Sequence, residues 1–207
     1  MLRLMRIAPC IIFLLALAAF VLPAGAQQGS FSVGSATAAP GQKATGYLEI
    51  PAGSDAGTRI PVVVVRGAHP GPVLAIVSGA HGTEYASIIA VEKLITSLDP
   101  ANISGTVILV PLVNSGSFLQ KVPHVNPVDN KSMNRFYPGK MDGTQTDRVS
   151  YAITKQIVDR CDYLIDLHGG DLDENLRPYS YWTIVGNEKV DRISREMALA
   201  FGLDTII

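Results

Sequence analysis

Short apolar runs alternate with segments of helical periodicity along most of the chain. The runs at 61–66, 73–78 and 106–112 are continuously apolar and rich in Val, Ile and Leu. Runs of this kind are typical of strands that are covered on both faces of a sheet. Their alternation with helices predicts an α/β fold, with three layers (α/β/α) around a mostly parallel or mixed central sheet.

The same pattern predicts where the individual elements lie. Helical periodicity extends over 83–97, 146–161 and 188–201. Between 112 and 146 no periodicity is visible, and compact domains rarely carry so long a loop without a use for it. That stretch is therefore a candidate binding loop. The expected strands are 46–50, 61–66, 73–78, 106–112 and 162–167, with weaker ones at 181–185 and 204–207.

The first residues follow a different pattern. Arg3 and Arg6 precede an apolar run over 11–22, and small residues follow at Ala24 and Ala26. This order is typical of a secretory signal peptide. We expect residues 1–26 to be cleaved after Ala26, which places the mature protein outside the cytoplasm, secreted or periplasmic, without a stable membrane anchor. The alternative is an uncleaved anchor, although the run is shorter than the roughly 20 apolar residues of a membrane span.

The composition changes again after this run. Residues 27–42 are rich in Gly, Ser and Ala and are interpreted as a flexible lead-in. A single domain is expected over 43–207, because a chain of 207 residues is too short for two domains of ordinary size. The apolar stretch 204–207 has no closing helix behind it, so we expect the domain to be truncated at its C-terminus. The alternative is a small domain whose last strand is central to the sheet.

Charge and cysteine content exclude some classes of protein. The formal net charge is -1, and no block of like charge occurs after the signal peptide, so nucleic acid is not expected as a partner. Of the two cysteines, Cys10 lies in the signal peptide. Cys161 is then left without an intramolecular partner, and the domain is expected to have no disulfide.

A strand-to-helix turn near residue 80 carries side chains that suit a metal ion. The segment VLAIVSGAHGTEYASIIAVEKLI places His81 and Glu84 after an apolar strand, and Gly79 and Gly82 let the backbone turn tightly there. Zinc accepts imidazole nitrogen and carboxylate oxygen, and open α/β sheets bind ligands at the carboxyl ends of their strands. The turn is a candidate zinc site, although His and Glu three residues apart also occur by chance.

A second strand end supplies another histidine. In CDYLIDLHGGD an apolar run leads to Asp166 and His168, which share a side because residues two apart in a strand point to one face. The carboxylate can then accept a hydrogen bond from the imidazole and fix its tautomer. Together His81, Glu84 and His168 make three protein ligands. Three ligands leave a fourth position for water, which indicates a catalytic rather than a structural zinc ion.

The long loop contains a candidate carboxylate-binding pair. In VNPVDNKSMNRFYPG, Asn134 and Arg135 precede an aromatic pair and a Pro-Gly turn. The planar guanidinium of arginine pairs with both oxygens of a carboxylate, and asparagine adds a donor beside it. The alternative is that Arg135 is an ordinary solvated loop residue.

These motifs together resemble the succinylglutamate desuccinylase and aspartoacylase family, deacylases built on the zinc carboxypeptidase fold. GAHGTE, MNRFYPG and DLHGGD occur in the order in which the family has them. The resemblance implies that His81, Glu84 and His168 hold one zinc ion. It also implies that Asn134 and Arg135 hold the carboxylate of a small-molecule substrate.

The resemblance covers the chain from about Arg66 onward and has two gaps. The family's deacylases have an arginine shortly before the Asn-Arg pair that helps to hold the polarised carbonyl oxygen. The matching stretch FLQKVPHVNPVD has none, and Lys121 or His124 is left as a candidate for that role. The family's catalytic glutamate lies on a later strand, so the general base is expected beyond Ile207. Three acidic residues near the DLHGG motif are expected at the surface or as loop caps: Asp171, Asp173 and Glu174.

The resemblance therefore implies a zinc-dependent hydrolase domain over 43–207. It would cleave an amide or ester bond, most simply by deacylating an N-acyl amino acid or a related substrate with a carboxylate. One alternative is a zinc carboxypeptidase acting on peptides, which uses the same ligand spacing. Another is a non-catalytic zinc- or ligand-binding domain, because the glutamate and the arginine are missing. NRFYPG and GAHGTE favour the deacylase.

Overall fold

A mixed five-stranded sheet forms the centre of the computed structural model, which describes residues 29–207. The strand order is β3-β4-β6-β5-β7. The pairs β3–β4 and β4–β6 are antiparallel, whereas β6–β5 and β5–β7 are parallel. The expected α/β fold with a mixed sheet is confirmed. The strands are β3 (Gln42–Ile50), β4 (Thr58–Arg66), β5 (His69–Ser78), β6 (Ser104–Val110) and β7 (Tyr163–Leu167).

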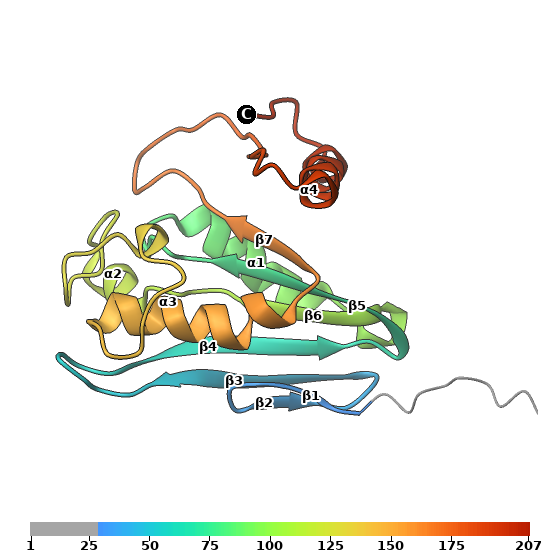
Figure 1. Ribbon diagram of the computed structural model, residues 1–207, viewed down its shortest axis with the longest axis horizontal. Helices are drawn as coiled ribbons and strands as arrows, with labels where there is room; N and C mark the ends of the chain where they lie inside the picture. Colours follow the sequence, from blue (N-terminus) through green and yellow to red (C-terminus); the bar gives the residue numbers. More distant parts are fainter. Residues whose placement is uncertain (1–28) are drawn as a thin grey trace, which may run out of the picture.

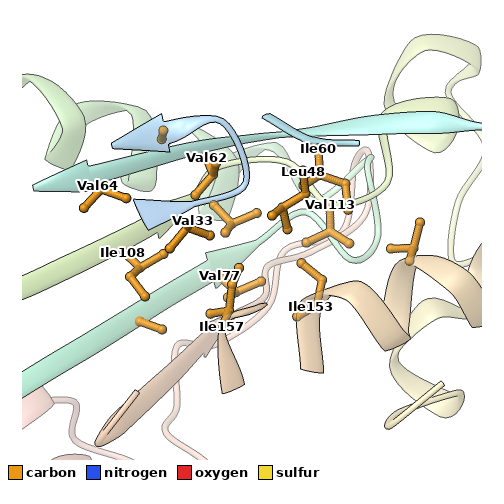
Figure 2. Close-up of a cluster of buried hydrophobic side chains, with 14 of the residues drawn as sticks. Val33, Leu48, Ile60, Val62, Val64, Val77, Ile108, Val113, Ile153 and Ile157 are labelled. Atoms are coloured by element: carbon orange, nitrogen blue, oxygen red, sulfur yellow. The ribbon is translucent and has the colours of Figure 1, made fainter. Parts of the chain in front are cut away.

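Helices cover both faces of this sheet (Figure 1). The helix α1 (Tyr85–Ser97) packs on one face and α3 (Gln145–Gln156) on the other. Successive strand residues point to opposite faces, so in β4 the side chain of Val64 joins the cluster beneath α3, while that of Val65 joins the cluster beneath α1. Because both faces of β4 are buried, successive residues of this strand must all be apolar, which explains its continuous apolar run. Figure 2 shows the larger cluster, in which Val62, Val64, Val77, Ile108, Ile153 and Ile157 are labelled.

The expected flexible lead-in over 27–42 is wrong for the residues that the structure describes. Strands β1 (Phe31–Val33) and β2 (Ala36–Ala38) form an antiparallel pair against the sheet. The side chains of Val33, Ala36 and Ala38 are fully buried in the larger cluster. The backbones approach closely, since a β-carbon at Gly46 of β3 would lie 2.4 Å from the backbone nitrogen of Ala36 in β2. Because β1 and β2 belong to the core, the domain begins well before residue 43.

Replacing Val33 with Asp is expected to lower the free energy of unfolding by at least about 2 kcal/mol. Val33 is 0% exposed, and a carboxylate there loses its water without gaining a partner. Val185→Asp is the matched control, because Val185 is 64% exposed and surface substitutions usually change stability by less than about 0.5 kcal/mol. Urea denaturation of both variants makes the comparison. Equal free energies of unfolding for the two variants would contradict the burial of Val33 and support the flexible lead-in that the sequence predicted.

The long loop between β6 and α3 contains two short helices that the sequence pattern did not predict. They are α2 (Ser115–Gln120) and the 3-10 turn η2 (Met133–Arg135). The loop is fastened to the start of α3, where Asp129 accepts hydrogen bonds from the backbone and hydroxyl of Thr146, both at 2.8 Å, and Lys131 pairs with Asp147 at 2.7 Å. The candidate binding loop is therefore held in a defined position.

The segment after β7 extends beyond the edge of the sheet (Figure 1). The helix α4 (Glu188–Phe201) has the predicted bounds. The weaker strands predicted at 181–185 and 204–207 are wrong. Backbone hydrogen bonds join Ser180 and Trp182 to the end of the chain, but they form only an isolated bridge, between Ser180 and Ile206. The distance of these two segments from the sheet leaves large apolar side chains such as Tyr181 and Ile184 exposed. Two further 3-10 turns are η1 (Pro100–Asn102) and η3 (Val158–Arg160).

The signal peptide expected over 1–26 lies outside the described residues, and so does its cleavage site. Within 29–207, no helix combines the length and the apolar character needed to cross a membrane.

Candidate metal centre

The candidate metal site lies where two parallel strands end. Ser78, the last residue of β5, pairs with Leu167, the last residue of β7. The carboxyl ends of parallel strands meet at one edge of a sheet, so the turn after β5 and the residues after β7 come together there. His168 is therefore a neighbour of His81 and Glu84 at this edge, although it is 84 residues from Glu84 in the sequence.

Two glycines give the turn after β5 its shape. Gly79 has φ +70°, a conformation that residues with a side chain rarely adopt. Gly82 is needed for a different reason, because α2 packs directly against it. A β-carbon at position 82 would lie 2.3 Å from the backbone nitrogen of Phe118 in α2. Any larger residue at position 82 would push α2 away from the turn that carries His81 and Glu84.

Glu84 bridges the two histidines. Its Oε1 lies 2.6 Å from Nδ1 of His81, and its Oε2 lies 2.9 Å from Nδ1 of His168. The backbone N–H of Gly169 also donates to Oε2, at 3.0 Å. Glu84 is 5% exposed, and one donor atom from each of the three side chains falls within a mutual distance of 4.8 Å. The three residues could therefore hold a metal ion, and two imidazoles with a carboxylate fit zinc.

Asp166 orients His168 from the other side of the ring. The Nε2 of His168 lies 3.1 Å from Oδ2 of Asp166. A carboxylate can only accept, so Nε2 carries the hydrogen and Nδ1 is the nitrogen that faces Glu84 and the other candidate ligands. The structure thus brings Asp166 and His168 together on one side, as their spacing in the strand suggested.

The charges in this site stabilise one another. Burial raises the pKa of Glu84, but hydrogen bonds with His168 and His81 outweigh burial and lower that pKa to about 2. Hydrogen bonds with Asp166 and then Glu84 raise the pKa of His168 to about 10. Without a metal ion at neutral pH, Glu84 is ionised and His168 carries an extra proton.

Metal binding is therefore expected to release a proton. His168 keeps its extra proton below a pH of about 10, and a metal ion requires a bare nitrogen. Between pH 7 and 9 the apparent zinc affinity should rise about tenfold for each pH unit, because one proton competes with the metal. Calorimetry in buffers with different ionisation enthalpies measures the released proton. A pH-independent affinity with no proton release would contradict the protonated state of His168.

The two predicted substrate-binding residues lie in η2, beside this centre. The hydroxyl of Ser132 lies 3.4 Å from Nε2 of His81 and donates to Oδ1 of Asn134 at 2.9 Å. Asn134 is half-buried and connected to the site in this way. Arg135 is exposed, and among residues 29–207 its guanidinium forms no hydrogen bond or ion pair. Its side chain is free to meet a ligand.

Sequence reasoning missed part of the surroundings of the site. Asp171 was expected at the surface or as a loop cap. It is instead 5% exposed, because the segment after β7 folds back onto the turn that carries Glu84. The hydroxyl of Thr83 donates to Asp171, and Nδ1 of His124 lies 2.7 Å from it. Ser132 was not singled out either, since a serine in a polar loop gives no signal. The burial of Asp171 depends on contacts with the distant residues Thr83 and His124, for which the sequence gave no local signal.

A mixed sheet with a His–Glu–His group at its carboxyl edge defines an α/β protein with a candidate metal centre. Residues 70–190, more than half of the chain, match the succinylglutamate desuccinylase/aspartoacylase catalytic domain. The chain belongs to this family.

Named relatives agree with this assignment. The N-alpha-acetyl-L-2,4-diaminobutyric acid deacetylase of Halomonas elongata is 31% identical over 161 residues, which are 76% of this chain and 46% of the relative. The succinylglutamate desuccinylase/aspartoacylase structure from Rhodobacter sphaeroides has a TM-score of 0.72 at 26% identity, covering 79% of this chain and 51% of the other. An aspartoacylase family protein from Mesorhizobium loti has a TM-score of 0.70 at 27% identity, covering 79% and 52%. The chain spans about half the length of these relatives.

Proposed function

We propose that this protein is a zinc-dependent hydrolase that removes the acyl group from an N-acyl amino acid or a related amide or ester with a carboxylate. The observation that carries the proposal is the group of His81, Glu84 and His168 at the carboxyl edge of the sheet. Membership in a family of deacylases supports the reaction. The deacetylase from Halomonas elongata supports a small acylated amino acid as substrate.

Each residue of the site has a distinct part in this proposal. His81, Glu84 and His168 hold the zinc ion, and Asp166 keeps His168 in the tautomer that ligation requires. When bound, zinc lowers the pKa of a water ligand and polarises a carbonyl group. Arg135 binds the substrate carboxylate and Asn134 supports it, so that the acyl carbon is held over the centre. A glutamate transfers the proton, as the resemblance to the family's deacylases implies.

Comparison of substrate classes tests the reaction. The purified full-length protein with zinc is expected to hydrolyse N-acetyl or N-succinyl amino acids and to lose this activity when a chelator removes the metal. Peptides with free C-termini are the comparison set. Release of C-terminal residues without deacylation would establish a carboxypeptidase instead, and zinc binding without either activity would establish a binding domain.

We also propose that the mature protein acts outside the cytoplasm, in the periplasm or as a secreted protein. The basic residues, the short apolar run and the small residues before position 27 support this location. The expected N-terminus of the mature protein is Gln27. Mass spectrometry of protein recovered from each cell compartment checks it, and an intact Met1 on cytoplasmic protein would contradict the proposal.

A further inference from the structure

His124 and Asp171 form a pair beside the candidate metal centre, and the proposed function leaves this pair without a role. The Nδ1 of His124 lies 2.7 Å from Oδ2 of Asp171. The His124 ring meets His81 edge-on, with 5.8 Å between the ring centroids. His124 comes from the long loop and Asp171 from the segment after β7, so two distant parts of the chain converge on the site.

Asp171 is fixed from several sides. It is 5% exposed, and the hydroxyl of Thr83 donates to its second carboxylate oxygen. Its backbone N–H donates to Oε2 of Glu174 at 3.0 Å, and the N–H of Leu172 donates to the carbonyl of Thr83 at 3.3 Å. Thr83 directly precedes the candidate ligand Glu84. Asp171 is therefore fastened to the turn that carries the metal site and can orient the imidazole beside it.

His124 is held in a rare backbone conformation and stays open to a ligand. Its φ is +62°, in the left-handed region that few residues other than glycine adopt. The N–H of Val125 donates to the carbonyl of Pro123 at 2.7 Å and closes a three-residue turn around it. The side chain is 61% exposed. Strained residues of this kind are concentrated in binding and catalytic sites.

The carboxylate of Asp171 determines which nitrogen of His124 carries the hydrogen. An ionised carboxylate only accepts, so Nδ1 must be the donor at a distance of 2.7 Å. In the neutral ring, Nε2 is then an acceptor, and it has no hydrogen-bond partner within residues 29–207. An acceptor on an exposed imidazole whose ring lies edge-on to His81 suits an N–H group of a ligand.

We propose that Nε2 of His124 accepts a hydrogen bond from the N–H of the scissile amide, so that His124 and Asp171 select amide over ester substrates. The inference rests on the proposed function and narrows its substrate class. No proton is transferred in this contact. An ester has no hydrogen at the corresponding oxygen, and its lone pairs would face those of Nε2.

A matched pair of substrates tests this role in the full-length zinc protein. One is an N-acetyl amino acid, and the other is the O-acetyl hydroxy acid in which oxygen replaces the N–H. His124→Ala is expected to lower kcat/KM for the amide about tenfold more than for the ester, the usual value of one hydrogen bond. His124→Gln, whose side-chain oxygen can accept, should recover part of the difference. His69→Ala, an exposed histidine at the start of β5, is the control and should change neither.

Other results would overturn the inference. An equal loss for both substrates would mean that His124 acts on the carbonyl oxygen, and no loss would mean that it does not touch the substrate. A fall in zinc content would mean that His81, His124 and Asp171, whose donor atoms also lie within 4.8 Å of one another, hold a second ion. If the wild-type protein cleaves neither substrate, the proposed function fails separately. In that case the preference for the amide is measured by calorimetry as a difference in binding affinity between the two compounds. Equal affinity of the wild-type protein for both would contradict the inference.

Discussion

Replacing His81 or His168 with alanine is expected to remove bound zinc and with it the hydrolytic activity. Each histidine presents Nδ1 to one oxygen of Glu84, so the loss of either leaves two of the three proposed ligands. Loss of an outer partner of a metal ligand already costs 10–100-fold in affinity, and loss of the ligand itself should cost at least about 100-fold. Elemental analysis and competition with a chromophoric chelator measure the change.

The variant Asp166→Asn should give an intermediate result. The carboxylate that accepts from Nε2 of His168 is lost, but the three candidate ligands remain. Zinc affinity is expected to fall about 10–100-fold, with partial activity at saturating zinc. His69→Ala controls for the loss of an imidazole far from the site. Undiminished zinc in both the His81 and the His168 variant would refute the centre.

Replacing Arg135 with alanine is expected to lower kcat/KM about 10–100-fold for a substrate that carries a carboxylate. A hydrogen bond to a charged group contributes about 1.5–3 kcal/mol, and the exposed guanidinium has no competing partner within residues 29–207. Most of the loss should be in KM, because the carboxylate is bound in the ground state as well as in the transition state. Arg135→Lys keeps the charge but not the planar pair of donors, so only partial recovery is expected.

Substrate analogues separate this role from a general effect on the fold. With a methyl ester in place of the substrate carboxylate, the wild-type protein and Arg135→Ala should have nearly the same kcat/KM. Arg192→Ala, which removes an exposed arginine of α4 that pairs with Glu196, should leave both substrates unaffected. Equal losses for substrates with and without the carboxylate would show that Arg135 is not its binding residue.

The strands that the sequence predicted correctly are those with a strong local pattern of apolar residues. Strands β4, β5 and β6 were predictable because burial on both faces leaves few alternatives to Val, Ile and Leu. β1 and β2 were missed because Gly, Ser and Ala are equally common in flexible segments, and close packing against β3 is visible only after folding. The weak strand at 181–185 had suitable residues, but its pairing with the segment at 204–207 is limited to an isolated bridge and a few backbone hydrogen bonds, too short for a ladder.

The sequence by itself determined the chemistry that is available: two strand ends with His81, Glu84, Asp166 and His168, and a loop with an Asn-Arg pair. The residue types and their spacing along the chain belong to the primary structure and are the same in any fold. The tertiary structure decided which of them meet, because the parallel pairing of β5 and β7 joins residues more than 80 positions apart. It also decided that Asp171 is buried against Thr83 and faces His124. That contact depends on how two loops pack, and no local pattern encodes it.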